Sequence, residues 1–177
     1  MRKRHSVLGF LFLLSVITYI DRVCISVAGP RMQEDLGMAP EQWGWVVGAF
    51  ALAYALFEIP TGAMGDRMGP RKVITRIVLW WSAFTTLTGA VSNYGVLLVV
   101  RFLFGAGEAG AYPNISASIS RWFPVAERAR SHGITWMSSR IGGAISPVLG
   151  VPIQMAFGWR ASFYVFGLVG VVGWFFW

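Results

Sequence analysis

Residues 6–28 read SVLGFLFLLSVITYIDRVCISVA, an apolar run whose only charged members are the adjacent Asp21 and Arg22. At about 1.5 Å per residue, a helix of about twenty residues crosses the roughly 30 Å hydrocarbon core of a bilayer. Runs of this kind recur along the chain, which is 55% apolar. The sequence therefore predicts an all-α membrane protein with six transmembrane helices, at residues 6–28, 42–64, 73–91, 95–119, 132–157 and 161–177.

The basic residues are grouped by loop, so membrane topology explains the net charge of +7 better than nucleic-acid binding does. They lie before the first span and after the second and fourth, at Arg2, Lys3, Arg4, Arg67, Arg71, Lys72, Arg76, Arg121, Arg128 and Arg130. Basic loops mark the cytoplasmic side. We therefore expect a multi-pass protein of the cell (inner) membrane with a cytoplasmic amino terminus.

Two other classes of protein are less consistent with the sequence. A basic start before an apolar run is also typical of a cleaved signal peptide, but no small-x-small cleavage site precedes Asp21. The single cysteine, Cys24, excludes an intrachain disulfide, and zinc-type spacings and a phosphate-binding Gly-x-x-x-x-Gly-Lys motif are absent from the sequence. We therefore expect no enzymatic activity, no metal and no cofactor. If the protein transports a solute uphill, an ion gradient would drive that transport.

Ionised residues occur inside the predicted spans, where a charge costs at least a few kcal/mol. They are Asp21, Arg22, Glu58, Arg101, Glu108 and Arg140. Such residues usually line a path for an ion or a polar solute. For Glu58, near the end of its span, a structural salt bridge is the preferred interpretation, and for Arg101 both interpretations stay open.

The predicted depths of these residues allow several of them to share one cavity. Asp21, Arg22 and Arg101 fall at a similar depth, whereas Glu108 lies two helical turns beyond Arg101, about 10 Å deeper. Tyr54 and Arg140 fall near that deeper level. Glycine allows membrane helices to pack closely, and glycine and proline allow them to bend. Residues of these two types surround Glu108: Gly105, Gly107, Gly110 and Pro113.

The segment between the second and third predicted spans reads GAMGDRMGPRK, from Gly62 to Lys72. It resembles the signature loop of the major facilitator superfamily, Gly-x-x-x-Asp-Arg-x-Gly followed by basic residues, and it falls at the matching place. In that family the loop is a gating element, which here would comprise Gly62, Asp66, Arg67, Gly69 and Arg71. A loop that only follows the positive-inside rule would explain the arginines but not the order of Gly, Asp and Gly.

Three further segments resemble the anion:cation symporter branch of this superfamily. They are residues 19–22 (YIDR), residues 101–114 from Arg101 through Glu108 to Asn114, and residues 121–128 (RWFPVAER). The branch includes transporters of hexuronates, aldonates, glucarate and phthalate. The resemblance covers essentially the whole chain and implies proton-coupled symport of a small organic anion, with sodium coupling as an open alternative.

Position by position, the resemblance implies a role for each charged residue. Asp21 and Glu108 would carry the coupling proton, Arg22 would bind the substrate carboxylate, Arg101 would tune Glu108, and Tyr54 would add a hydroxyl to the cavity. From depth alone, we add Arg140 as a second guanidinium for a dianion, since arginine grips carboxylates with two parallel hydrogen bonds.

The chain departs from the family pattern in its length. Transporters of this family have twelve spans in two related halves, and substrate binds between the halves. This sequence resembles only the amino-terminal half, a bundle of three plus three helices, so we expect a missing carboxyl-terminal partner half. A fragment without transport activity, or a structural half that packs against a separate chain, is the alternative.

Overall fold

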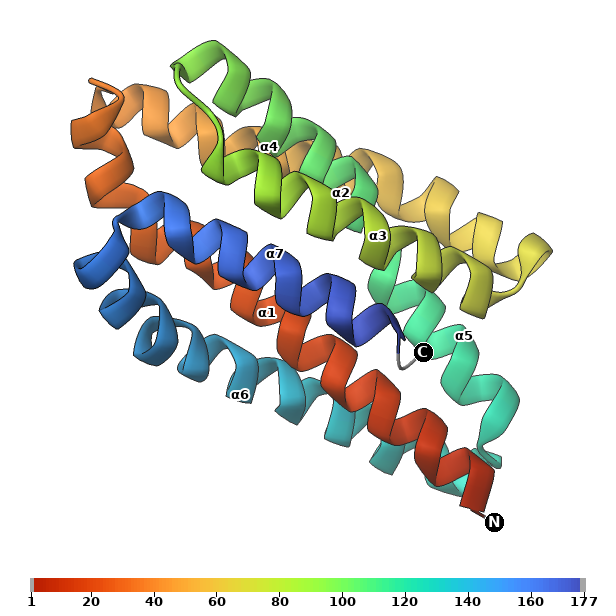
Figure 1. Cartoon of the computed structure of the whole chain (residues 1–177). Coiled ribbons are helices and arrows are strands. Elements are labelled where there is room, and N and C mark those ends of the chain that lie inside the picture. Colours follow the sequence, from red (N-terminus) through yellow and green to blue (C-terminus); the bar gives the residue numbers. More distant parts are fainter. Residues whose placement is uncertain (1, 176–177) are drawn as a thin grey trace.

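The computed structural model describes residues 2–175, which are almost entirely helical and contain no strand (Figure 1). The helices are α1 (Arg2–Asp35), α2 (Pro40–Met68), α3 (Pro70–Gly89), α4 (Tyr94–Glu108), α5 (Ala111–Trp122), α6 (Val125–Phe157) and α7 (Trp159–Phe175). The prediction of an all-helical chain is therefore confirmed.

The helices α4 and α5 form one bent unit rather than two separate spans. They are parted only by Ala109 and Gly110, and Gly110 has φ of +85°, a backbone conformation that suits glycine. Pro113 lies in the first turn of α5, where a proline removes no helical hydrogen bond. The bundle thus consists of six units, as the sequence predicts, with the fourth one bent beside Glu108.

Helix lengths exceed the predicted apolar spans at most boundaries. The differences are large at the end of α1, which continues to Asp35 rather than to residue 28, and at the start of α6, which begins at Val125 rather than at residue 132, because the added turns are polar but still helical. By length and apolar composition alone, three segments of the described chain are able to cross a membrane: Lys3–Asp35, Pro40–Met68 and Tyr94–Trp122. Trp159–Val172 is apolar but shorter.

The long helices run side by side and alternate in direction (Figure 1). The start of α1, the α2–α3 junction and the α5–α6 junction lie at one end of the bundle, and the α1–α2, α3–α4 and α6–α7 junctions lie at the opposite end. Because most basic residues belong to the first set of junctions, the charge is concentrated at one end.

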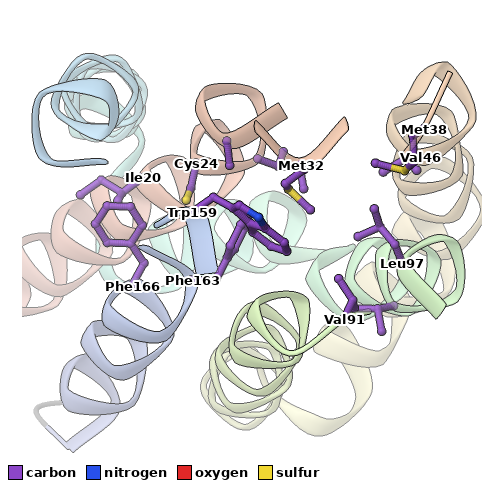
Figure 2. Close-up of a cluster of buried hydrophobic side chains, with 13 residues drawn as sticks. Ile20, Cys24, Met32, Met38, Val46, Val91, Leu97, Trp159, Phe163 and Phe166 are labelled. Carbon is purple, nitrogen blue, oxygen red and sulfur yellow. The ribbon is translucent and has the colours of Figure 1, made fainter. Parts of the chain in front are cut away.

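Two apolar clusters fill the bundle, one toward each end. The cluster in Figure 2 joins α1 to α7 and extends to α2 and α4, through residues that include Ile20, Cys24, Met32, Val46, Leu97, Trp159, Phe163 and Phe166. The second cluster centres on α3, where Val73, Ile74, Ile77 and Trp81 pack against α1, α4 and α5.

Candidate functional site

An ion pair joins α1 to the last residue of α4 at the bend. The Nη2 atom of Arg22 lies 2.6 Å from Oε1 of Glu108, and Nε of Arg22 donates to the same oxygen at 3.2 Å. The Glu108 side chain is 1% exposed, whereas that of Arg22 is 25% exposed. The pair therefore places a guanidinium at the edge of a buried carboxylate, within reach of a second anion.

Aromatic rings surround the Arg22 guanidinium. Its Cζ lies 4.9 Å from the ring centre of Tyr54, 5.2 Å from that of Phe50 and 5.4 Å from that of Tyr19. Ring faces attract cations and exclude water, so they hold the guanidinium in place without using up its hydrogen-bond donors. The structure thus brings Tyr54 beside Arg22.

Arg101 is buried but does not reach Glu108. Its Cζ packs over the rings of Phe50, at 4.9 Å, and Phe104, at 4.8 Å, and the described residues give it no ion pair. The resemblance to the symporter branch implies that Arg101 tunes Glu108. In the structure Arg22, and not Arg101, forms the ion pair with Glu108.

Asp21 is 3% exposed, and within the described chain neither of its carboxylate oxygens has a hydrogen-bond partner. Asp21 and Arg22 are consecutive in α1, so their side chains leave the helix about 100° apart. Arg22 points toward the α2 and α4 side, whereas Asp21 lines a cavity between α1, α6 and α7. The two acids expected to carry the proton thus have different surroundings.

Arg140 is not brought to this cluster. It is exposed on α6, and in the described part of the chain it makes no hydrogen bond, ion pair or ring contact. Its neighbour Ser139 shares a hydrogen bond of 2.7 Å with the hydroxyl of Tyr112 on α5. Arg140 is therefore not part of the cluster around Arg22.

Three polar or aromatic features of the site were missed by the sequence analysis. Tyr19 lies three residues before Arg22, and Phe50 four before Tyr54, so helical spacing would have placed each ring beside its neighbour. Asn114 donates from Nδ2 to the carbonyl oxygens of Gly110, at 2.7 Å, and Thr61, at 3.2 Å. It thereby ties α2 to the bend, which no pattern in the sequence indicated.

The expected gating loop is mostly helical. Gly62, Asp66 and Arg67 lie within α2, Arg71 lies in the first turn of α3, and only Gly69, with φ of +90°, breaks the helix. Asp66 and Arg67 are exposed, and among the described residues neither forms an ion pair. The segment is therefore a one-residue turn between helices rather than an extended loop.

Comparison with known proteins identifies the family. The model of the major facilitator superfamily matches residues 11–177. A probable sulfoacetate transporter of Cupriavidus necator is 44% identical over 98% of this chain and 40% of its own length. The hexuronate transporter of Bacillus subtilis is 35% identical over 94% of this chain and 39% of its own length, and a probable L-galactonate transporter of Escherichia coli is 35% identical over 93% and 37%.

A solved structure has the same arrangement of helices. A bacterial homologue of the human lysosomal transporter Spinster, in an inward-facing and occupied conformation, superposes with a TM-score of 0.88 at 27% identity. The match covers 99% of this chain and 43% of that chain. The chain thus spans about two-fifths of the length of the curated relatives it matches, and it belongs to the major facilitator superfamily of membrane transporters, not to an enzyme family.

Proposed function

We propose that this chain supplies the amino-terminal half of a transporter that moves a small organic anion, a sugar acid or another carboxylate, by proton symport with alternating access. The relatives named for hexuronate, L-galactonate and sulfoacetate all carry anions. The observation that carries the proposal is the partly exposed Arg22 guanidinium held by the buried Glu108.

The geometry suggests how anion binding and proton binding are linked. Glu108 occupies the Nε and Nη2 donors of Arg22, which are also the donors that grip a carboxylate with two parallel hydrogen bonds. A substrate carboxylate would therefore compete with Glu108 for the same guanidinium. A proton on Glu108 removes its charge and releases Arg22, so that proton and anion load together.

Asp21 supplies a second acid near this pair. Its carboxyl group is buried without a hydrogen-bond donor in the described chain. An isolated carboxylate in such surroundings is costly, whereas its protonated form is not. Asp21 would then hold a proton in part of the transport cycle, while Arg22 meets the substrate from the other side of α1.

The chain needs a partner for its exposed apolar side chains. Ile59 and Trp45 on α2 are 81% and 69% exposed, and Met155 and Val148 on α6 are 72% and 69% exposed. Such surfaces are stable only against lipid or another helical bundle. We assign the α2 and α6 faces to contacts with the lipid bilayer and with a carboxyl-terminal six-helix half. Arg140 on α6 would contact substrate only at the interface with that second half.

The concentration of basic residues at one end of the bundle supports the proposed orientation. Cytoplasmic loops carry an excess of lysine and arginine, so the end with the start of α1, the α2–α3 junction and the α5–α6 junction would face the cytoplasm of an inner membrane.

The test is uptake into proteoliposomes by the transporter that joins this chain to its carboxyl-terminal half. Labelled glucuronate, galactonate, glucarate and sulfoacetate are offered with and without a pH gradient, and with sodium replaced by choline. We expect accumulation of at least one of them to depend on the pH gradient. Dependence on sodium instead would reject proton coupling.

Two variants test the residue roles. Glu108→Gln and Asp21→Asn should abolish gradient-driven accumulation while exchange of labelled for unlabelled anion survives, because exchange needs no net proton movement. Glu41→Gln, an exposed acid in the first turn of α2, is the matched control and should accumulate normally. Undiminished uphill uptake in both test variants would reject this coupling scheme.

The alternative is a structural half that does not transport by itself. It is favoured by the same exposed apolar faces, which leave Arg22 without an opposing wall in this chain. Reconstituting the 177-residue chain alone, and then with a separately expressed carboxyl-terminal half, distinguishes the two. Uptake that appears only after both halves are mixed would show that the chain is a structural half requiring its partner.

A further inference from the structure

A cavity beside Asp21, on another side of α1 from Arg22, has apolar walls to which the proposed transport mechanism gives no role. Its volume is about 210 Å³, and it lies between α1, α6 and α7. The lining residues are Ile17, Ile20, Asp21, Leu149, Ile153, Val165, Phe166 and Val169. Asp21 is the sole polar side chain in this set, so the cavity is an apolar crevice that ends at one carboxyl group.

The crevice opens between α6 and α7. Leu149 on α6 and Val165 and Val169 on α7 are all exposed, whereas Ile20 and Phe166 at the inner end are buried. The ion pair of Arg22 with Glu108 lies on the α2 and α4 side of α1 instead. In a bilayer, exposed valine and leucine side chains on these helices would face acyl chains, so the opening would be toward the bilayer rather than toward water.

Asp21 gives the crevice a binding group. Its two oxygens have no hydrogen-bond donor in the described chain, and leaving a buried acceptor without a donor is costly. A ligand that fills the apolar walls and brings one donor would remove that cost. A small apolar body with one well-placed polar group is the usual content of such a pocket.

We propose that this crevice is a ligand site for small apolar molecules that carry one hydrogen-bond donor and enter from the bilayer, with Asp21 as their polar contact. A cyclohexyl-sized alcohol fits the volume and the lining. The site lies apart from the Arg22 face. The proposed transport mechanism also uses Asp21, but ligand binding in the crevice does not depend on transport.

The access route is tested by covalent labelling of the chain in proteoliposomes. Dicyclohexylcarbodiimide dissolves in bilayers, and a carboxyl group adds across its N=C bond to give an adduct that contains the whole reagent, which peptide mass spectrometry locates. We expect the adduct on Asp21 and its loss in Asp21→Asn. A positively charged, water-soluble carbodiimide should label Asp21 at least tenfold more slowly.

Crevice-filling substitutions test the path. Val169→Trp and Leu149→Trp place a large ring in the opening and should reduce labelling of Asp21 at least tenfold. Val172→Trp and Val148→Trp are the matched controls, since both residues are exposed on the same two helices but do not line the crevice. Circular dichroism would verify that all four variants keep the helical content of the original chain.

Protection of Asp21 from labelling by a bound ligand tests whether the ligand needs a hydrogen-bond donor. Cyclohexanol should slow the labelling of Asp21, whereas methylcyclohexane, which has the same ring but no donor, should not. The proposal is overturned if Asp21 is not labelled, if the charged reagent labels it as fast, if crevice-filling and control variants behave alike, or if the two protecting molecules act equally. None of these outcomes bears on uptake, so failure here and failure of the proposed transport function remain distinguishable.

Discussion

The Nη2 atom of Arg22 and the Oε1 atom of Glu108 lie 2.6 Å apart and join the first helix to the end of the fourth. Glu108 is the last residue of α4, directly before the bend at Ala109 and Gly110. The pair is therefore attached to the one place where the backbone of this unit leaves the helical path. Making or breaking it changes the connection between α1 and the bend.

Removing one partner of this pair should destabilise the chain strongly. Arg22→Met leaves Glu108 buried without its cation, and breaking a buried pair typically costs about 3 to 5 kcal/mol. The double variant Arg22→Met with Glu108→Met should recover most of that loss, because no unpaired charge remains. The free energy of unfolding in mixed detergent micelles measures both.

The exposed pair of Arg160 and Asp35, also 2.6 Å apart, is the control for that experiment. Its side chains are 41% and 45% exposed, and exposed pairs contribute little to stability because water screens them. Arg160→Met should therefore change the unfolding free energy little. The prediction fails if Arg22→Met and Arg160→Met lower the unfolding free energy equally, or if the double variant recovers none of the loss. Either result would show that the unpaired charge of Glu108 does not determine the stability of the chain.

The sequence was sufficient to predict the fold class because long apolar runs and basic loops follow from the bilayer itself. Depth placed Tyr54 near Glu108 and placed Arg22 about two helical turns away from both, yet the structure brings the three residues together. The sequence did not predict that Arg22 rather than Arg101 would pair with Glu108. That choice depends on how far α1 is rotated relative to α4, which hydropathy and depth do not specify.

The placement of Asp21 and Arg140 shows the same limit. Depth put both residues near the cavity, but Asp21 lines the other side of α1 and Arg140 is exposed on α6. A residue's depth follows from counting along a helix, whereas its direction depends on which helices pack against it. Side-chain direction is therefore where the sequence analysis was least informative.

Arg101 should behave differently from Arg22 when replaced. Its guanidinium is buried over Phe50 and Phe104 without an ion pair in the described chain. Arg101→Met loses ring contacts worth up to about 2 kcal/mol but also removes the desolvation cost of a buried charge, which is several kcal/mol. We expect an unfolding free energy within about 1 kcal/mol of the original, or higher.

Chemical denaturation of the Arg101→Met and Arg101→Lys chains side by side would measure this. Lysine keeps the charge but packs less well over two rings, so Arg101→Lys should be the less stable of the two. A loss of more than about 3 kcal/mol in Arg101→Met would mean that a charge at this position is required for folding.

Asn114 should hold the bend in place. Its Nδ2 donates to the carbonyl oxygens of Gly110 and Thr61, so Asn114→Ala would leave two buried acceptors with fewer donors. We expect a loss of about 1 to 3 kcal/mol in unfolding free energy. Faster hydrogen exchange at amides near Gly110 should accompany it, because the connection between α2 and the bend is lost.

Ser118→Ala is the matched control for Asn114. The Ser118 hydroxyl is also buried, but it donates only to the carbonyl oxygen of Asn114 in its own helix. Its removal leaves the contact between α2 and the bend unchanged, so hydrogen exchange near Gly110 should stay at the original rate. If both variants speed that exchange equally, Asn114 acts through general packing and not through its two hydrogen bonds.

Close helix contacts should make two glycines intolerant of even one methyl group. A Cβ at Gly142 on α6 would collide with the backbone of Val16 on α1, and a Cβ at Gly105 on α4 would collide with the carbonyl group of Phe50 on α2. Neither backbone can move without separating two helices. Gly142→Ala and Gly105→Ala should therefore each lower the unfolding free energy by about 1 to 3 kcal/mol.

Gly133 provides the comparison within α6, since a Cβ there meets no atom within 4 Å. Gly133→Ala should leave the stability unchanged or raise it by up to about 1 kcal/mol, because alanine favours the helix over glycine. Gly105→Ala should in addition weaken substrate binding, since Phe50 contacts both Arg22 and Arg101. Equal stability of all three variants would mean that the helices can separate at no cost in free energy. In that case the close approach of α2 to α4 does not position the Arg22 site.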